Sequence, residues 1–246
     1  MSLSITPFSP VIGAIVYLLL LLSLSSPAFA GPDHAASVSR LEQKTDPSFF
    51  QTTVRQRHDF SCGAAALATL LIYHYGVMVT DEEVFAAMLK EGDEEKIRAD
   101  GFSMLNMKKY LDVSGYDSAG YELTLDRLVD IGLPGIALIS FRGFNHFVVI
   151  KGISPTEVLL GDPMLGIRTI PRSTFANIWN GMIFIIRSQP EAGRISFNRD
   201  WEWEAGLRNA PSEERWLSRS PSGDIHRSAA LEKGAMSGAG CRVVNR

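Results

Sequence analysis

The stretch QRHDFSCGAAA at residues 56–66 carries the strongest information in this chain about its fold and its chemistry. It is polar up to Ser61, and the mostly apolar residues 64–75 that follow predict a buried helix ending at Gly76. Cys62 therefore lies at a helix N-terminus, where the helix dipole and unpaired backbone N–H groups favour a thiolate. With a basic neighbour, such a position lowers a thiol pKa from roughly 8.5 to ~3.5–7.5, so the pattern predicts a nucleophilic cysteine.

Two short β-strands are predicted further along the chain. The first, NHFVVIKG at residues 145–152, begins with His146, and the second, EVLLGDP at residues 157–163, ends with Asp162 and a proline. The Ser-Pro-Thr loop between them predicts an antiparallel hairpin, which would bring the start of one strand level with the end of the other. We therefore expect His146 and Asp162 to be neighbours, as a base and the carboxylate that orients it.

These side chains match the requirements of acyl transfer. The thiolate of Cys62 would attack a carbonyl, and His146 would protonate the leaving amine while Asp162 fixes the imidazole tautomer. The backbone N–H of Cys62 and the uncharged amide of Gln56 are the expected donors to the oxyanion.

A Gln six positions before a Cys-Gly, then His-Phe-Val-Val, then Asp-Pro, resembles the motif set of the C39 peptidases, which are papain-like enzymes. This resemblance implies that Cys62 is the nucleophile, His146 the base, Asp162 the third member and Gln56 the oxyanion donor. The residue before the cysteine is often Asp in the transporter-linked members and is Ser61 here, which indicates a different branch.

The resemblance covers about residues 54–187. The best-known C39 peptidases are cytosolic domains of transporters and cleave leader peptides after a double glycine. This sequence contains no Gly-x-x-x-x-Gly-Lys phosphate loop, so it resembles free-standing exported members that accompany functional-amyloid secretion. The resemblance implies a cysteine endopeptidase that processes another exported polypeptide at a Gly-rich or small-residue site. A fibril component or its secretion machinery would be the substrate.

Two other functions use the same residues. A C39-like domain can act as a non-catalytic module that docks peptides, although retention of Cys62 argues against this. A papain-like amidase or transglutaminase-type enzyme would use the same Cys, His and Asp. A cysteine in an Ala/Leu-rich segment is also commonly a small buried hydrophobe, so the catalytic interpretation depends on the four residues occurring together.

The N-terminus predicts export. Residues 11–24 form an apolar core and Ala28-Phe29-Ala30 supplies small residues for cleavage, so residues 1–30 are expected to be a signal peptide and the protein periplasmic. No Lys or Arg precedes the apolar core, so an uncleaved anchor that associates with the membrane is the alternative. A disulfide between Cys62 and Cys241 would consume the nucleophile, so we expect no structural disulfide. The alternative is that such a bond forms reversibly and inhibits the enzyme.

The remaining sequence predicts one α+β domain of papain-like fold, with N-terminal helices packed on an antiparallel sheet. Residues 31–50 are a polar lead-in, residues 51–188 the peptidase domain, and residues 189–246 a polar extension. The extension is either disordered or helical and docked through its tryptophans, Trp201, Trp203 and Trp216. The net charge of −3 gives no reason to expect nucleic acid, and no metal-ligand cluster or cofactor motif is present in the sequence.

Local signals predict the other elements. Thr80 with Glu83 forms a capping box, and Ser103 and Thr124 cap two further helices. The charged residues 91–100 are expected to form a loop. Strands are expected at residues 136–141, 167–170 and 182–187, with a helix at residues 171–179.

Overall fold

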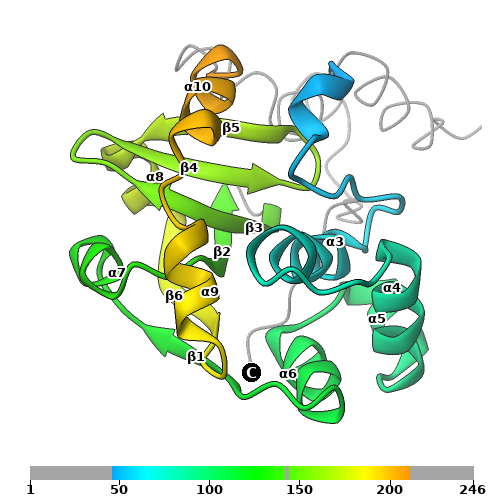
Figure 1. The fold of residues 1–246 in the computed structure, drawn as a ribbon. Coiled ribbons are helices and arrows are strands. Elements are labelled where there is room, and N and C mark those ends of the chain that lie inside the picture. Colours follow the sequence, from blue (N-terminus) through cyan, green and yellow to red (C-terminus); the bar gives the residue numbers. More distant parts are fainter. Residues whose placement is uncertain (1–45, 142–143, 211–246) are drawn as a thin grey trace, which may run out of the picture. The chain divides into compact units, whose positions relative to one another are not determined.

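A computed structural model describes residues 46–141 and 144–210 (Figure 1). At its centre is a six-stranded sheet in the order β1-β6-β2-β3-β4-β5, in which every neighbouring pair is antiparallel. The strands are β1 (Ser118–Glu122), β2 (Gly135–Phe141), β3 (Phe144–Ile153), β4 (Glu157–Asp162), β5 (Gly166–Pro171) and β6 (Trp179–Ile186).

The central strands are buried on both faces. In β2, Ile136 and Leu138 belong to one hydrophobic cluster, whereas Ala137 and Ile139 belong to the other. β3 and β6 alternate in the same way. Because successive side chains of a strand point to opposite faces, burial on both sides explains why these strands read as continuous apolar runs.

Helices cover both faces of the sheet. One cluster is shared with α3 (Cys62–Thr69), α4 (Asp81–Lys90) and α6 (Met104–Val113), and the other with α7 (Leu125–Ile131) and α8 (Arg172–Ile178). The predicted α+β class is confirmed, with N-terminal helices packed on an antiparallel sheet. The second helical layer and the edge strand β1 were not expected, because a short half-exposed strand carries little pattern.

The helix starts follow their local chemistry. Thr80 and Glu83 form the predicted capping box, with the Glu83 N–H 3.2 Å from the Thr80 hydroxyl. Past α3 the chain continues as a π-helix, η2 (Leu70–His74), and Gly76 then takes a left-handed φ of 64°. The predicted loop at residues 91–100 is wrong, because it contains α5 (Glu94–Asp100). An Asp93 cap starts this helix, but it buries only Ile97, too little to show a helical period in the sequence.

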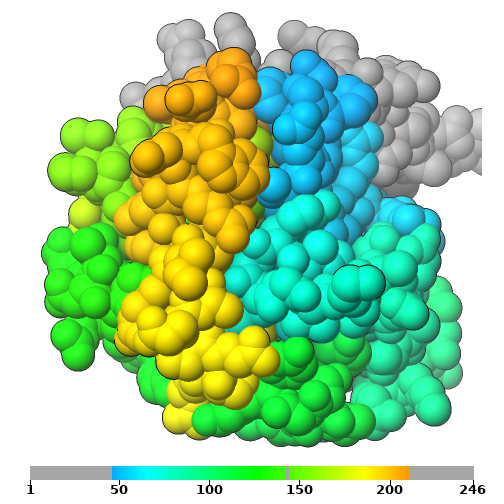
Figure 2. All heavy atoms as spheres, viewed as in Figure 1, coloured from blue at the N-terminus to red at the C-terminus, as the bar shows by residue number. Residues whose placement is uncertain are grey.

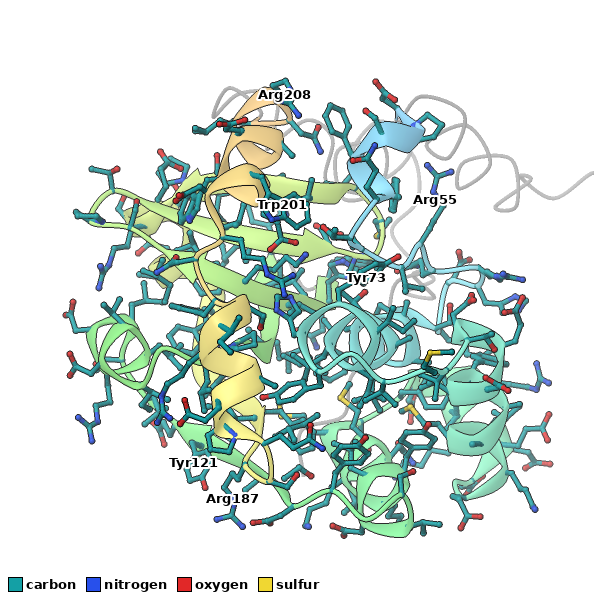
Figure 3. All side chains as sticks on the ribbon, in the orientation of Figure 1. Arg55, Tyr73, Tyr121, Arg187, Trp201 and Arg208 are labelled. Carbon is teal, nitrogen blue, oxygen red and sulfur yellow. The ribbon has the colours of Figure 1, made fainter. Side chains whose placement is uncertain are left out.

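Residues beyond the predicted domain limit form two helices, α9 (Pro190–Ser196) and α10 (Asp200–Arg208). The buried residues of α10 are Glu202 and Gly206. Trp201 is 50% exposed (Figure 3), whereas Trp203 is partly buried, and a Cβ at Gly152 of β3 would lie 3.2 Å from its Nε1. Gly206 permits close packing, because a Cβ there would lie 2.5 Å from Cδ1 of Leu159 in β4.

Several predictions fall outside the described residues. These are the signal peptide at residues 1–30, most of the lead-in, Trp216 and Cys241. Within residues 46–141 and 144–210, no helix combines the length and the hydrophobicity needed to cross a bilayer.

A buried histidine links α9 to the rest of the domain. Nδ1 of His74 lies 2.9 Å from the Ser196 hydroxyl, and this hydroxyl donates to the Gly193 carbonyl at 2.8 Å. Because the hydroxyl proton is already used, Nδ1 must be the donor in the bond to Ser196. Burial, with a smaller effect from the charges of Lys151 and Arg199, lowers the pKa of His74 well below its usual 6.5.

This histidine makes stability depend on pH. Above pH 6.5 the imidazole is neutral in both states, whereas below pH 6.5 only the unfolded chain binds the proton, so stability falls as the pH drops. We expect the free energy of unfolding to lose about 1.4 kcal/mol from this group between pH 7.5 and 5.5. Urea denaturation at both pH values measures it, and His74→Asn, which keeps a donor toward Ser196, should lack this increment. An equal pH dependence in both proteins would contradict the assignment.

Candidate active site

Cys62 is the first residue of α3 and is buried. The preceding Ser61 does not cap the helix: its hydroxyl accepts from the His58 N–H at 3.0 Å and donates to the His58 carbonyl at 2.9 Å. The first-turn N–H groups of α3 are therefore not occupied by a side-chain cap, which suits them to an anion.

Gly63 brings this helix start close to β3. A Cβ at Gly63 would lie 2.8 Å from Cβ of Phe102 and 3.3 Å from Cδ2 of Phe147, so a larger residue would push the helix away. Gly63 follows Cys62 and Phe147 follows His146. The close approach therefore places the start of α3 beside the start of β3.

His146 and Asp162 lie together as the hairpin predicts. Nε2 of His146 is 2.8 Å from Oδ1 of Asp162, and both side chains are buried. Met164 N–H also donates to this oxygen, at 2.9 Å. Nδ1 of His146 has no hydrogen-bond partner in the described part of the chain. Because Asp162 holds Nε2, Nδ1 is the ring nitrogen left to exchange a proton with a nucleophile.

Arg168 binds the other oxygen of Asp162. Its Nε and Nη2 lie 3.0 Å and 2.9 Å from Oδ2. Burial alone would raise the pKa of Asp162, but the charges of His146 and Arg168 and the hydrogen bonds to the carboxylate outweigh it and hold this pKa well below its usual value. Asp162 is thus ionised across the physiological pH range. Sequence analysis missed Arg168, whose position six residues after Asp162, across a turn, was the available signal.

Gln56 is fixed beside the Asp162 turn. Its backbone N–H donates to the Pro163 carbonyl at 3.0 Å, and its Nε2 donates to the His58 carbonyl at 3.3 Å. An amide NH₂ carries two donor hydrogens, so this bond orients the amide and leaves the second hydrogen for another acceptor.

The segment before Gln56 is held at two further points. The Val54 N–H donates to the Thr69 hydroxyl of α3 at 2.9 Å. Lys151 Nζ donates to the carbonyl and hydroxyl of Thr52 at 2.8 Å and 2.9 Å, and forms an ion pair with Glu202 of α10. In Figure 2, the residues of α10 accordingly lie against the segment that begins with η1 (Pro47–Phe50).

A β-bulge turns Lys151 toward these partners. Ile150 pairs with Leu160 and Gly152 with Leu159, so Lys151 is the additional residue in β3. Lys151 and Glu202 are both 0% exposed. Burial lowers the pKa of Lys151 to about 8, against the opposing effect of Glu202. Neither residue was singled out from the sequence, because a bulge and a long-range ion pair leave no local pattern.

A hollow of about 140 Å³ lies between the segment before α3 and the start of α4. Phe85 and His58 contribute aromatic rings to it, and Arg57 forms an ion pair with Asp81 at 2.9 Å on its wall. Gln56 also lines it, so the hollow adjoins the candidate oxyanion donor.

Only a thiolate attacks a carbonyl, so the site described above reacts in the reduced protein. In residues 46–141 and 144–210, no three His, Cys, Asp or Glu side chains converge to hold a metal ion.

Comparison with known proteins identifies the family. The model of the peptidase C39 family matches residues 51–191. The chain belongs to the peptidase C39 family. As a C39 protein it is a cysteine peptidase, in agreement with the resemblance drawn from its motifs.

This C39 peptidase is similar to two proteins of pseudomonads. It is 39% identical over 176 residues to the "probable functional amyloid protease FapD" of Pseudomonas fluorescens, covering 69% of this chain and 77% of the relative. It is 37% identical over 179 residues to the FapD of Pseudomonas aeruginosa, covering 71% and 79%. Among solved structures, a double glycine motif protease from an AMS/PCAT transporter, in complex with its leader peptide, matches with a TM-score of 0.46 and 29% identity over 55% of this chain and 89% of that one.

Among the contacts that hold the segment carrying Gln56, the buried Lys151–Glu202 ion pair should contribute most to stability. Lys151→Met leaves a buried carboxylate without its cation and should lower the free energy of unfolding by about 3–5 kcal/mol. The double variant Lys151→Met/Glu202→Met removes both charges at similar volume and should recover most of the loss. Urea denaturation measures both effects.

Lys108→Met is the matched control, because it breaks an exposed pair with Asp112. It should cost less than about 1 kcal/mol. If the double variant is no more stable than Lys151→Met, packing volume rather than the unpaired charge explains the loss.

Proposed function

We propose that this protein is an exported cysteine endopeptidase in which Cys62 is the nucleophile, His146 the base, Asp162 its orienting carboxylate and Gln56 an oxyanion donor. One observation carries the proposal: Asp162 holds Nε2 of His146 at 2.8 Å, so that Nδ1 is the ring nitrogen left for a nucleophile. In a cysteine peptidase the imidazole needs one nitrogen for the thiol and the other for its orienting group.

The reaction proceeds in two steps. The thiolate of Cys62 attacks the peptide carbonyl carbon, and the negative charge moves to the carbonyl oxygen. The backbone N–H of Cys62 and the second N–H of the Gln56 amide donate to that oxygen. The His146 imidazolium then gives its proton to the leaving amine, and the C–N bond breaks to leave a thioester. Water, deprotonated by His146, attacks the thioester and releases the acid and the thiol.

The substrate is proposed from the relatives. Two similar proteins carry the description of a functional amyloid protease, so a fibril component or a part of its secretion machinery is the proposed substrate. We further propose that residues 1–30 direct the chain to the periplasm and that cleavage occurs in a flexible segment rich in Gly or other small residues. A narrow site that admits only small side chains beside the scissile bond would exclude folded surfaces.

The test compares exported proteins by mass spectrometry in cells carrying wild type, Cys62→Ala or Cys241→Ser. We expect a protein encoded beside this chain to remain uncleaved, and so to have a higher mass, in the Cys62→Ala cells. In the wild-type and Cys241→Ser cells it should show a defined new terminus. Identical masses in all three, with one neighbour co-purifying with the Cys62→Ala protein, would favour a docking module. Deamidated or cross-linked neighbours would identify an amidase or transglutaminase-type enzyme.

Variants of the other site residues should separate their roles in the cleavage of a peptide that contains the identified site. Asp162→Asn should lower kcat by about a hundredfold or more without abolishing it, because the imidazole loses its orientation while nucleophile and base remain. Gln56→Ala should lower kcat by about 10²–10³ with little change in KM, since its donor acts on charge that develops in the transition state.

Circular dichroism and thermal unfolding provide the control that each variant folds. His146→Ala should be nearly as inactive as Cys62→Ala. A folded Gln56→Ala protein with wild-type kcat would remove Gln56 from the oxyanion site.

A further inference from the structure

Arg168 and His146 bind opposite oxygens of one buried carboxylate. Oδ1 of Asp162 accepts from His146 Nε2 at 2.8 Å and from the Met164 N–H at 2.9 Å, whereas Oδ2 accepts from Nε and Nη2 of Arg168 at 3.0 Å and 2.9 Å. All three side chains are buried. The carboxylate therefore cannot rotate toward or away from the imidazole without breaking charge-assisted bonds on its other side.

The sheet, rather than a loop, sets the position of Arg168. In the β4–β5 pair Asp162 lies opposite Gly166, so Arg168, two residues further on, faces the same side of the sheet as Asp162. Leu160 lies opposite Arg168 in the same ladder. A long side chain at such a diagonal position reaches its cross-strand neighbour, and a backbone held on both strands leaves it little freedom.

Several charged groups of the neighbouring elements form ion pairs of their own. Asp162 of β4 is the titratable group bonded to His146 of β3, and Arg168 of β5 is the cation on Asp162. Lys151 of β3 pairs with Glu202 of α10, and Arg57, which precedes α3, pairs with Asp81 and Glu82 of α4.

We propose that Arg168 is a positioning residue of the peptidase site, which fixes Asp162 against His146 and, by its positive charge, makes the imidazolium a readier proton donor. This inference rests on the proposed roles of His146 and Asp162. An unpaired buried carboxylate would bind the imidazolium proton tightly and slow its transfer to the leaving amine. The positive charge of Arg168 compensates the negative charge of that carboxylate. Asp162 therefore orients the imidazole ring without binding the imidazolium proton too tightly.

Two substitutions separate the charge of Arg168 from its geometry. Arg168→Gln keeps a hydrogen-bond donor near Oδ2 but removes the charge, whereas Arg168→Lys keeps the charge but loses the two-nitrogen fork. Arg187→Gln is the matched control, because it removes an exposed arginine that is bound to Asp117.

The decisive measurement is an NMR titration of the His146 imidazole in the Cys62→Ala protein, which needs no peptide substrate. A His146→Ala spectrum assigns the signal among the five histidines. We expect Arg168→Gln to raise the pKa of His146 by about one pH unit, and Arg168→Lys and Arg187→Gln to leave it within about 0.3 unit of the parent. An unchanged titration in Arg168→Gln would overturn the electrostatic role.

Peptide cleavage tests the consequence in proteins with Cys62 intact. Arg168→Gln should lower kcat about tenfold or more with little change in KM, and move the basic limb of the pH profile upward by the shift seen in the titration. Arg168→Lys should lower kcat without moving either limb of the pH profile. A purely structural role would instead lower the fraction of folded protein and leave kcat per folded site and both limbs unchanged.

The results distinguish a failure of this inference from a failure of the proposed function. If wild type cleaves nothing but the His146 titration shifts as expected, the link through Asp162 stands and the peptidase assignment of these residues fails. If Arg168→Gln does not fold, the kcat of Arg168→Lys decides whether Arg168 positions Asp162. A lowered kcat with an unmoved titration supports positioning, and a wild-type kcat overturns it.

Discussion

The charge on Asp162 is the constraint on which the site depends. Burying a carboxylate is costly unless cations and hydrogen bonds compensate for lost water, and here His146, Arg168 and the Met164 N–H supply that compensation from two strands and one turn. The same contacts orient the imidazole. Stability of the sheet end and geometry of the site therefore depend on one set of bonds, and a change at Asp162 should affect both.

The remainder of the site is assembled by close approach between separate layers. Gly63 lets α3 approach β3, and Gly166, with a left-handed φ of 78°, lets the β4–β5 turn pass next to η1, where a Cβ would lie 2.5 Å from the Phe49 carbonyl oxygen. The segment with Gln56 crosses between them, held by Lys151 and Thr69. Helix, sheet and crossing segment thus position the proposed nucleophile, base and oxyanion donor independently.

The helices α9 and α10 give this C39 peptidase a feature that lies largely beyond the matched family region of residues 51–191. They are joined to the domain by buried polar contacts: His74 with Ser196, and Lys151 with Glu202. Replacing such a pair with apolar residues is often neutral, so a buried ion pair mainly penalises arrangements in which either charge lacks its partner. The extension therefore helps to fix the segment that carries Gln56.

The sequence by itself determined the α+β class, most helix starts, the hairpin between His146 and Asp162 and the four candidate site residues. These are set by signals within a few residues: caps, turns, strand alternation and the motif around Cys62. The tertiary structure alone decided the partners of Arg168 and Lys151, the placement of α7 and α8 on the second face of the sheet and the position of α10. Such features join residues far apart in the chain, where burial and bulge geometry, rather than local propensity, select the contact.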